Sequence, residues 1–238
     1  MNTLSEWWNT LPSLLPGLKV SFELLLATIL IGTPLAIALA LARRSRRAAV
    51  RWLGIVLMEI GRGIPSLVLV YLVYFGLPDA GIRLEAISAA SIALGLNFAS
   101  YTSEAFRSGL DAVPVGQSEA AQALGLSKRV EMQRVILPQA MRIVTPPLIS
   151  WVIVYFQTTS VAFAISAPEL MSTAHSIASA NFKYMSTFVL TGLIYAFFSI
   201  PGSRLVAALE KKHHSPPKTT SLLVSAIRRR RPEKVENS

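Results

Sequence analysis

Residues 119–129 of this chain read EAAQALGLSKR, and residues 136–138 read ILP. This polar stretch lies between long apolar stretches. The alanines and leucine before Gly125 predict a short helix that the glycine ends, and Ser127 is a typical N-cap for a second short helix. Pro138 is expected to stop that second helix. Two short helices between apolar spans indicate either a docking surface for another protein or an amphipathic segment on the lipid headgroups.

The composition indicates a membrane protein with several spans. The chain has 238 residues, of which 52% are hydrophobic and 15% are charged, and soluble domains carry more charge. It has no cysteine, which excludes disulfides, thiolate metal sites and a cysteine nucleophile. The net charge of +10 would also suit a nucleic-acid-binding protein. Because the basic residues cluster beside apolar stretches, where they orient a protein in the bilayer, we expect membrane lipids and not nucleic acid as partners.

Five apolar stretches are long enough to cross a bilayer, which takes about 20 residues. The basic block at Arg43–Arg47 and the basic residues after the third stretch mark the cytoplasmic side. The chain is therefore expected to be an all-α membrane protein with its N-terminus outside and its C-terminus in the cytoplasm. The expected organisation is an external segment (1–17), a transmembrane domain (18–210) with spans at about 18–42, 53–77, 86–106, 143–165 and 187–209 and a cytoplasmic loop at 107–142, and a basic, disordered cytoplasmic tail (211–238).

Polar side chains lie inside two of these expected spans. Asn97 and Tyr101 are one helical turn apart and share a face of the third span, and Thr158, Thr159 and Ser160 interrupt the fourth. Lipid offers no hydrogen-bond partner, so these groups must face protein or water. Two roles remain open: they line a polar path, or they hold helices together.

Glu23 is an ionisable residue within the first expected span. A charge inside a span is a functional candidate, because burying it without a partner costs several kcal/mol. In the alternative interpretation, Glu23 lies near the outer interface, reaches water and pairs with Lys19 at helical spacing.

Several separate motifs, occurring in the same order, resemble the permease subunits of binding-protein-dependent polar amino acid ABC importers, the family of the histidine, glutamine, arginine and glutamate permeases. They are EAAQALG (119–125) with ILP (136–138), NFASYTSEAFRSGLDAVPVG (97–116) and RGIPSLV (62–68). The resemblance covers about residues 17–209. It implies the type I ABC importer permease fold and a multi-pass protein of the bacterial inner membrane.

The resemblance implies a transport subunit and not an enzyme. Because the chain has no Gly-x-x-x-x-Gly-Lys-Ser/Thr phosphate loop, ATP and Mg²⁺ are expected on a separate ATPase, with no cofactor in this chain. By resemblance, the residues that couple to the ATPase are Glu119, Ala120, Ala121, Gly125, Ile136, Leu137 and Pro138. Those of the substrate path are Asn97, Tyr101, Thr158, Thr159 and Ser160, with Glu23 as a further candidate, and those that pack the gate are Arg62 and Pro65.

The implied partners are an ABC ATPase dimer, a periplasmic or lipid-anchored amino acid-binding protein near residues 167–186, and a second permease subunit, identical or related. Members of the family often carry Lys-Asp-Thr-Ser-Leu where this chain has QTTSV (157–161). The acidic residue is thus absent at Thr158, which weakens the case for a cationic substrate.

Two other classes remain to be compared. A secondary transporter or a small channel would also place polar residues in its spans, but it would not need the loop between Glu119 and Pro138. An intramembrane enzyme would need a paired nucleophile and base or two acidic residues at one depth. The serines in the expected spans have no histidine or lysine partner there, and Glu23 has no second carboxylate at its level.

Overall fold

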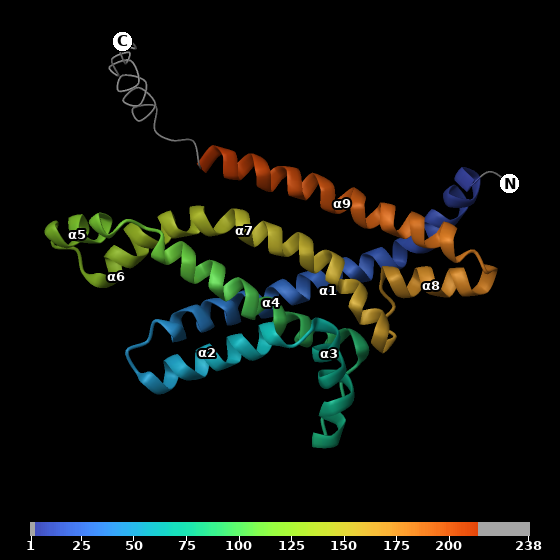
Figure 1. Cartoon of the computed structure of the whole chain (residues 1–238), viewed down its shortest axis with the longest axis horizontal. Coiled ribbons are helices and arrows are strands. Elements are labelled where there is room, and N and C mark those ends of the chain that lie inside the picture. Colours follow the sequence, from blue (N-terminus) through green and yellow to red (C-terminus); the bar gives the residue numbers. More distant parts are fainter. Residues whose placement is uncertain (1–2, 214–238) are drawn as a thin grey trace, which may run out of the picture.

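The computed structural model describes residues 3–213, and every regular element within them is a helix (Figure 1), so the expected all-α class is confirmed. Of the tail predicted at 211–238, the part from residue 214 on lies outside the described residues. The elements are α1 (Thr3–Arg43), α2 (Ala48–Gly63), α3 (Ser66–Tyr71), the π-helical η1 (Leu72–Gly76), the 3-10 helix η2 (Leu77–Ala80), α4 (Ala86–Asp111), α5 (Val115–Ala123), α6 (Lys128–Glu131), the π-helical η3 (Met132–Ile136), α7 (Leu137–Thr158), the 3-10 helix η4 (Thr159–Ile165), α8 (Leu170–Asn181) and α9 (Tyr184–His213).

Helix α4 is the centre of the bundle and packs against α1, α2, α3 and α7. More than half of its residues are buried. Its alanines, glycines and serines let neighbouring backbones approach closely, as is common between membrane helices. A Cβ atom added to Gly32 of α1 would lie 2.8 Å from the carbonyl oxygen of Gly95 in α4. The backbones of α1 and α4 are therefore in direct contact.

The remaining helices give the bundle two distinct ends (Figure 1). Helix α7 packs against α4 and α9, and α8 packs against α1 and α9. Helices α5 and α6 form one end of the molecule, while α8 and the start of α1 form the other. Helix α3, followed by η1 and η2, projects from the side of the bundle as an arm (residues 66–80).

Helix α1 runs without a break for 41 residues, although Pro12, Pro16 and Pro34 lie inside it. The segment expected as a separate external part (1–17) thus supplies the first turns of the same helix. It stays helical because it packs against α8 and α9, and Leu14 is completely buried there. At 1.5 Å per residue the helix is about 60 Å long, roughly twice the hydrocarbon thickness of a bilayer.

The expected second span (53–77) is not a single helix. Helix α2 ends at Gly63 and α3 begins at Ser66, and the two halves are bent by 105°. Pro65 lies at this break and has no N–H with which to continue the helix. A proline alone usually kinks a membrane helix less than this, and side chains of α4 complete the break as described below.

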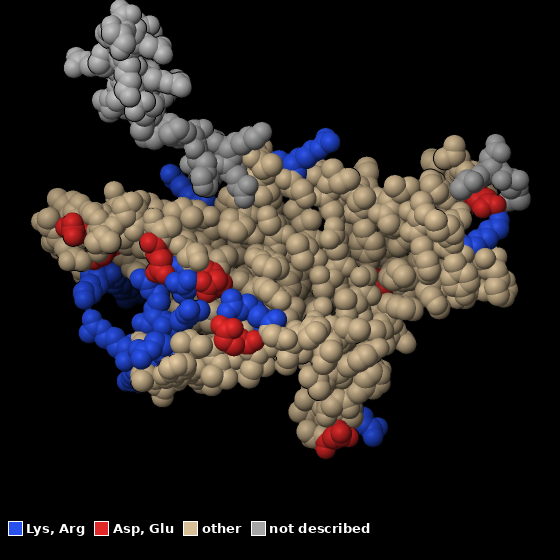
Figure 2. Space-filling view, viewed as in Figure 1, with Lys and Arg blue, Asp and Glu red and all other residues tan. Residues whose placement is uncertain are grey.

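Within residues 3–213, three helical stretches are long and apolar enough to cross a membrane, and the bent pair could be a fourth. They are Leu4–Arg43, Lys128–Ile165 and Tyr184–Leu209. Helix α4, expected as the third span, is not among them, because its many small and polar residues lower its hydropathy. The expected count of five spans is therefore not confirmed by length and composition. On the face shown in Figure 2, charged side chains gather mostly at the α5–α6 end.

Candidate functional site

The α5–α6 segment (residues 115–131) has the helix, break and helix that the sequence predicts. Helix α5 ends at Ala123, and Gly125 follows with a φ of 71°, a left-handed conformation that glycine adopts without strain. Ser127 is the N-cap of α6, and its hydroxyl accepts a long hydrogen bond of 3.5 Å from the N–H of Val130. Two short helices are thus joined by a tight turn at one end of the molecule.

The two faces of α5 differ in exposure. Glu119 and Ala120 are exposed, whereas Ala121 is buried on the side that faces α6 and η3. Ala121 is therefore not on the outer surface, where we expected it. Leu124, which the sequence reasoning did not single out, is 79% exposed. Glu119 and Leu124 are thus among the side chains that the segment offers to a partner.

Pro138 begins a helix and does not end one, so the predicted stop at this residue is wrong. The π-helical η3 leads from α6 directly into α7, and Pro138 lies in the first turn of α7, where a missing N–H costs little. Ile136 is half-buried and Leu137 is exposed. Because Lys128–Ile165 forms one continuous helical stretch, α6 is rigidly joined to α7.

Side-chain hydrogen bonds fasten α5 to the helices beside it. The hydroxyl of Ser118 donates to the buried carboxylate of Glu131 in α6. The side-chain amide of Gln139 in α7 donates to Gln117 Oε1 over 3.1 Å. A force on α5 therefore reaches α7 through these contacts as well as through the chain itself.

An ionic network joins the ends of α1 and α4 close to this segment. Glu104 accepts hydrogen bonds from Arg107 and from Arg43 Nη1, the latter over 3.2 Å. Asp111 accepts from Arg44 Nη1 over 2.9 Å and from Arg107 Nη1 over 2.7 Å. Each partly exposed pair adds little stability by itself, but together they cross-link two helices. The sequence reasoning missed this network, although the helical spacing of its α4 members was visible.

The side chain of Asn97 lies between the break in α2 and helix α7. Its Nδ2 donates to the carbonyl oxygen of Gly61 over 2.7 Å, and its Oδ1 accepts from the hydroxyl of Tyr155, also over 2.7 Å. One turn along α4, the hydroxyl of Tyr101 donates to the carbonyl oxygen of Arg62 over 3.2 Å. Asn97 and Tyr101 share a face, as expected, and both bind backbone at the break. These are contacts that hold helices together.

A cavity of about 500 Å³ lies beside the break, between α4 and α7. Arg62, Tyr101, Glu104 and Trp151 are among its lining residues. Arg62 also pairs with Glu59, its Nη2 lying 2.5 Å from Glu59 Oε1. Pro65, the other residue expected to pack the gate, is the N-cap of α3. The two residues thus flank the break from either side.

The hydroxyls of Thr158, Thr159 and Ser160 bond to their own helix. Each donates to a carbonyl oxygen three or four residues earlier, over 2.7 to 2.8 Å, so none needs a partner on another helix. Thr159 is completely buried. Ser160 lines a cavity of about 610 Å³ together with Leu67 of α3 and Tyr195 of α9. Of Thr158, Thr159 and Ser160, it is Ser160 that lines this cavity.

Glu23 lies on the exposed face of α1, and its Oε1 is 3.7 Å from Lys19 Nζ. Both side chains are more than half exposed. This is the pairing with Lys19 that the alternative interpretation expects. Within residues 3–213, no group of three or more histidines, aspartates and glutamates is arranged to hold a metal ion.

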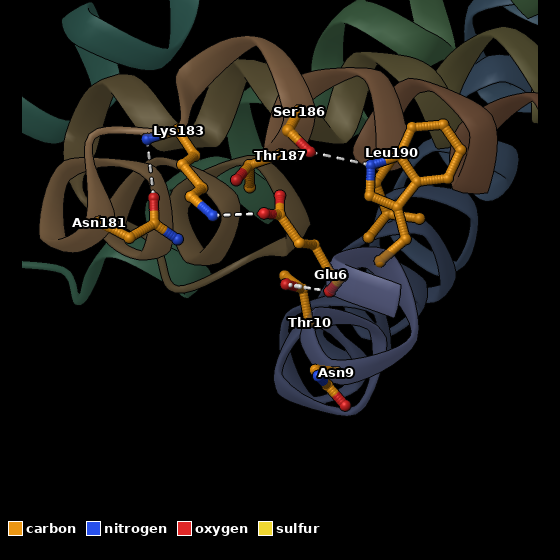
Figure 3. Close-up of a pocket in the computed structure, with 9 residues that line it drawn as sticks. Glu6, Asn9, Thr10, Asn181, Lys183, Ser186, Thr187 and Leu190 are labelled. Carbon is orange, nitrogen blue, oxygen red and sulfur yellow. Dashed lines mark hydrogen bonds and ion pairs between the residues drawn. The ribbon is translucent and has the colours of Figure 1, made fainter. Parts of the chain in front are cut away.

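Two contacts tie the start of α1 to the turn between α8 and α9, at the end opposite the α5–α6 segment (Figure 3). Lys183 Nζ lies 2.5 Å from Glu6 Oε1, and Trp7 Nε1 donates to Ser186 Oγ over 3.0 Å. We call these two contacts the clasp. They line a polar cavity of about 180 Å³. The clasp explains why the first turns of α1 hold their place.

Glu169 is the N-cap of α8 and is completely buried, a role that the sequence reasoning did not assign. Its carboxylate accepts the N–H groups of Met171 and Ser172, both over 2.8 Å, and the hydroxyl of Tyr195 over 3.2 Å. Burial raises the pKa of this carboxyl, and the backbone hydrogen bonds partly oppose that rise. Glu169 thus joins the α8 end to α9.

Comparison with known proteins identifies the architecture. Residues 32–214 match the family described as binding-protein-dependent transport system inner membrane component. The probable amino-acid ABC transporter permease protein YckA of Bacillus subtilis is 37% identical over 187 residues, covering 79% of this chain and 83% of YckA. The octopine transport system permease protein OccM of Rhizobium meliloti is 35% identical over 212 residues, covering 85% of this chain and 86% of OccM.

Solved structures of ABC transporters also match this fold. A structure described as an amino acid ABC transporter with histidines superposes with a TM-score of 0.82 at 29% identity, covering 89% of this chain and 99% of that chain. The MetNI methionine ABC transporter, at 19% identity and a TM-score of 0.65, shares the fold. The resemblance noted in the sequence is thereby confirmed. The chain belongs to the family of inner membrane components of binding-protein-dependent transport systems and is a multi-pass protein of the inner membrane.

Proposed function

We propose that this chain is the permease subunit of an ATP-driven importer that moves a polar amino acid across the inner membrane by alternating access. The α5–α6 segment docks on a separate ATPase dimer, which binds ATP and Mg²⁺, and this chain itself carries no cofactor. The substrate class is inferred from the relatives, which are amino-acid ABC transporter permeases by name.

The geometry of the α5–α6 segment is the observation that carries this proposal. It is an exposed pair of short helices at one end of the bundle, it presents Glu119 and Leu124, and it continues without a break into α7. Such a part transmits a push as a rigid body. A secondary transporter or a channel has no use for it.

The proposal includes five spans, with the N-terminus outside and the C-terminus in the cytoplasm. We assign α4 as the remaining span, which is the third in chain order. Its 26 residues extend about 39 Å, which exceeds the hydrocarbon thickness. The basic residues Arg43, Arg44, Lys128 and Arg129 all lie toward the α5–α6 end. That end is therefore assigned to the cytoplasm.

The substrate path is assigned to the 610 Å³ cavity, where Ser160 provides a hydroxyl beside Leu67. Thr158 and Thr159 shape the wall next to it. Asn97 and Tyr101 do not line this cavity in the proposal. They hold the break beside it in place, because their polar groups are hydrogen-bonded to its backbone. Glu23, paired with Lys19 on the exposed face of α1, lies outside the path.

A periplasmic or lipid-anchored binding protein is proposed to dock at the α8 end. Leu4, Trp8, Phe182 and Met185 are each more than 70% exposed there. Along α1, Trp8 lies 35 residues from Arg43, which is about 52 Å and exceeds the 40–45 Å of a bilayer with its headgroups. With α1 upright in the bilayer, the start of the helix therefore extends beyond the lipid, and exposed apolar patches mark protein contacts. A second permease subunit, identical or related, completes the path.

Reconstitution tests the proposal. The permease, its ATPase and its binding protein are placed in proteoliposomes, and ATP-dependent amino acid uptake is measured for the wild type and for Glu119→Lys. Glu85→Lys, the same charge reversal just before α4, is the control. We expect uptake that requires ATP, is lost in Glu119→Lys and is kept in the control. Uptake that ignores ATP would instead identify a secondary transporter or a channel.

A further inference from the structure

The break between α2 and α3 leaves two backbone carbonyls at the end of α2 without helical hydrogen-bond partners. In an α-helix the carbonyl of residue i accepts from the N–H of residue i+4, and for Gly61 that residue is Pro65, which has no N–H. The carbonyl of Arg62 loses its partner because the chain turns by 105° at this point. An unpaired carbonyl away from water is costly.

Side chains of α4 replace both missing donors. Asn97 donates to the carbonyl of Gly61 over 2.7 Å, and Tyr101 donates to that of Arg62 over 3.2 Å. Asn97 is only 4% exposed. A Cβ atom added to Gly61 would lie 2.0 Å from Ser100 Oγ, so α2 and α4 are in contact here. The break is therefore held in place by α4 and is not a free joint.

Helix α7 reaches the same point through Tyr155. Its hydroxyl donates to Asn97 Oδ1 over 2.7 Å, and its ring packs edge-on against Phe98 with centroids 5.0 Å apart. Tyr155 is 2% exposed. Tyr155, Asn97 and the carbonyl of Gly61 thus form a continuous hydrogen-bond relay from α7 through α4 to α2.

Both ends of this relay lead to walls of one cavity. Beyond the break, α3 carries Leu67, which lines the 610 Å³ cavity. Beyond Tyr155, the same cavity is lined by Ser160 and Val161. A displacement of α7 that pulls on the relay would therefore move both walls together.

We infer that Tyr155 and Asn97 are positioning residues that pass the displacement of α7 to the break in α2, so that the arm moves with each ATP cycle. This inference rests on the proposed function, since it gives the α5–α6 segment a route to the cavity. Neither residue touches substrate in this role. Without the relay, the ATPase still turns over, but the arm follows α7 less closely, because only the packing of α3 against η4 and α4 then links them.

Tyr155→Phe removes the hydroxyl of the relay, and Asn97→Ala removes its amide, and neither adds volume to this buried site. Thr102→Val is the matched control, because Thr102 is an equally buried hydroxyl on α4 that bonds only to Phe98 of its own helix, over 2.7 Å. The chain lacks cysteine, so one introduced residue, Leu72→Cys in the exposed arm, takes an environment-sensitive fluorophore in every variant. Two quantities are measured in proteoliposomes with ATPase and binding protein: amino acids imported per ATP, and the change in fluorescence on adding ATP.

We expect both relay variants to assemble and hydrolyse ATP, while the number of amino acids imported per ATP falls about fivefold, in keeping with the loss of one hydrogen bond. The fluorescence response should weaken in both, and the double variant should be no worse than either single one. Thr102→Val should behave as the wild type.

Relay variants that import and respond like Thr102→Val would overturn the inference and leave the proposed function intact. So would uptake and ATP hydrolysis that fall together with the yield of assembled complex, since that result describes a purely structural role. A wild type without ATP-driven uptake would instead overturn the proposed function and, with it, this inference.

Discussion

The sequence singled out residues both in the α5–α6 segment and around the break between α2 and α3. The two groups of residues differ in their exposure and in their hydrogen-bond partners. In the α5–α6 segment, Glu119 is exposed and free to meet a partner. At the break, Asn97 is buried, and both ends of its amide are hydrogen-bonded within the chain.

The difference separates two ways in which a polar residue can serve transport. An exposed residue contributes through what it contacts outside the chain, so its substitution should change assembly with a partner and leave the fold intact. A buried, fully bonded residue contributes through the geometry it imposes. Its substitution should change how helices move or how stable they are.

The largest expected effect lies in the α5–α6 segment, at Gly125. A β-branched side chain is strained at a φ of 71°, so Gly125→Val should misplace α6 relative to α5. We expect ATP-dependent uptake to fall at least about tenfold, the equivalent of ~1.4 kcal/mol of docking free energy. The yield of folded permease should change little, and size-exclusion chromatography with the ATPase measures the weakened complex.

Gly81 provides the control for Gly125. It has a φ of 81°, and an added Cβ meets nothing within 4 Å at either glycine, but Gly81 lies at the tip of the arm, away from α5 and α6. Gly81→Val should therefore suffer the same local strain and keep its ATPase. Equal loss of ATPase binding in the two variants would show that strain alone, and not the position of α6, decides docking.

At the break the next largest effect is expected in stability. Gly61→Ala places a methyl group against Ser100, and overpacking of this kind costs about 1–3 kcal/mol. Gly63→Ala, two residues later, meets nothing within 4 Å and should be neutral. The measurement is the Tm of the detergent-solubilised permease for both variants. A Tm for Gly61→Ala equal to that of Gly63→Ala would show that α2 and α4 separate easily, contrary to the close contact described here.

The sequence predicts the α5–α6 segment well because its signals are local. A glycine that ends one helix and a serine that caps the next act within a few residues, so Gly125 and Ser127 lie where expected. Pro138 misled the prediction because proline is tolerated in the first turn of a helix as well as after the last. Only the structure, in which η3 continues directly into α7, shows that Pro138 does not follow the end of a helix.

The break and α4 depend on partners that are distant in the sequence. Asn97 and Tyr101 could be recognised by their shared face, but the groups they bind, the carbonyls of Gly61 and Arg62, lie 36 and 39 residues away. Pro65 signals a weak point in α2, whereas the 105° bend needs the side chains of α4 as well. Because other helices of the chain surround α4, it crosses the bundle with few of the large apolar residues that a lipid-facing helix requires.

Glu169 extends the comparison to a buried group that titrates. Its pKa is raised by burial, so the stability it contributes is present below the unfolded pKa and is lost as the pH rises through the folded pKa. We expect the Tm of the permease to fall as the pH rises above the ordinary pKa of a carboxyl group, and Glu169→Gln to show a smaller fall because the amide does not ionise. Thermal melts of both proteins across this rise in pH measure the effect. Parallel Tm profiles would mean that Glu169 does not titrate in the folded protein.

The smallest effect is expected at the clasp, which resembles the α5–α6 segment in being partly exposed. Glu6→Gln removes the pair with Lys183 but keeps the hydrogen bond of Trp7, and an exposed ion pair contributes about 0.2–1 kcal/mol. Lys19→Gln, which removes a longer and more exposed pair on the same helix, should cost less still. The Tm of each variant, measured at low and high salt, gives the ranking. A loss for Glu6→Gln as large as that for Gly61→Ala would mean that a partly exposed ion pair can stabilise the fold as much as a buried contact, and the contrast between exposed and buried polar residues would then not extend to this end of the molecule.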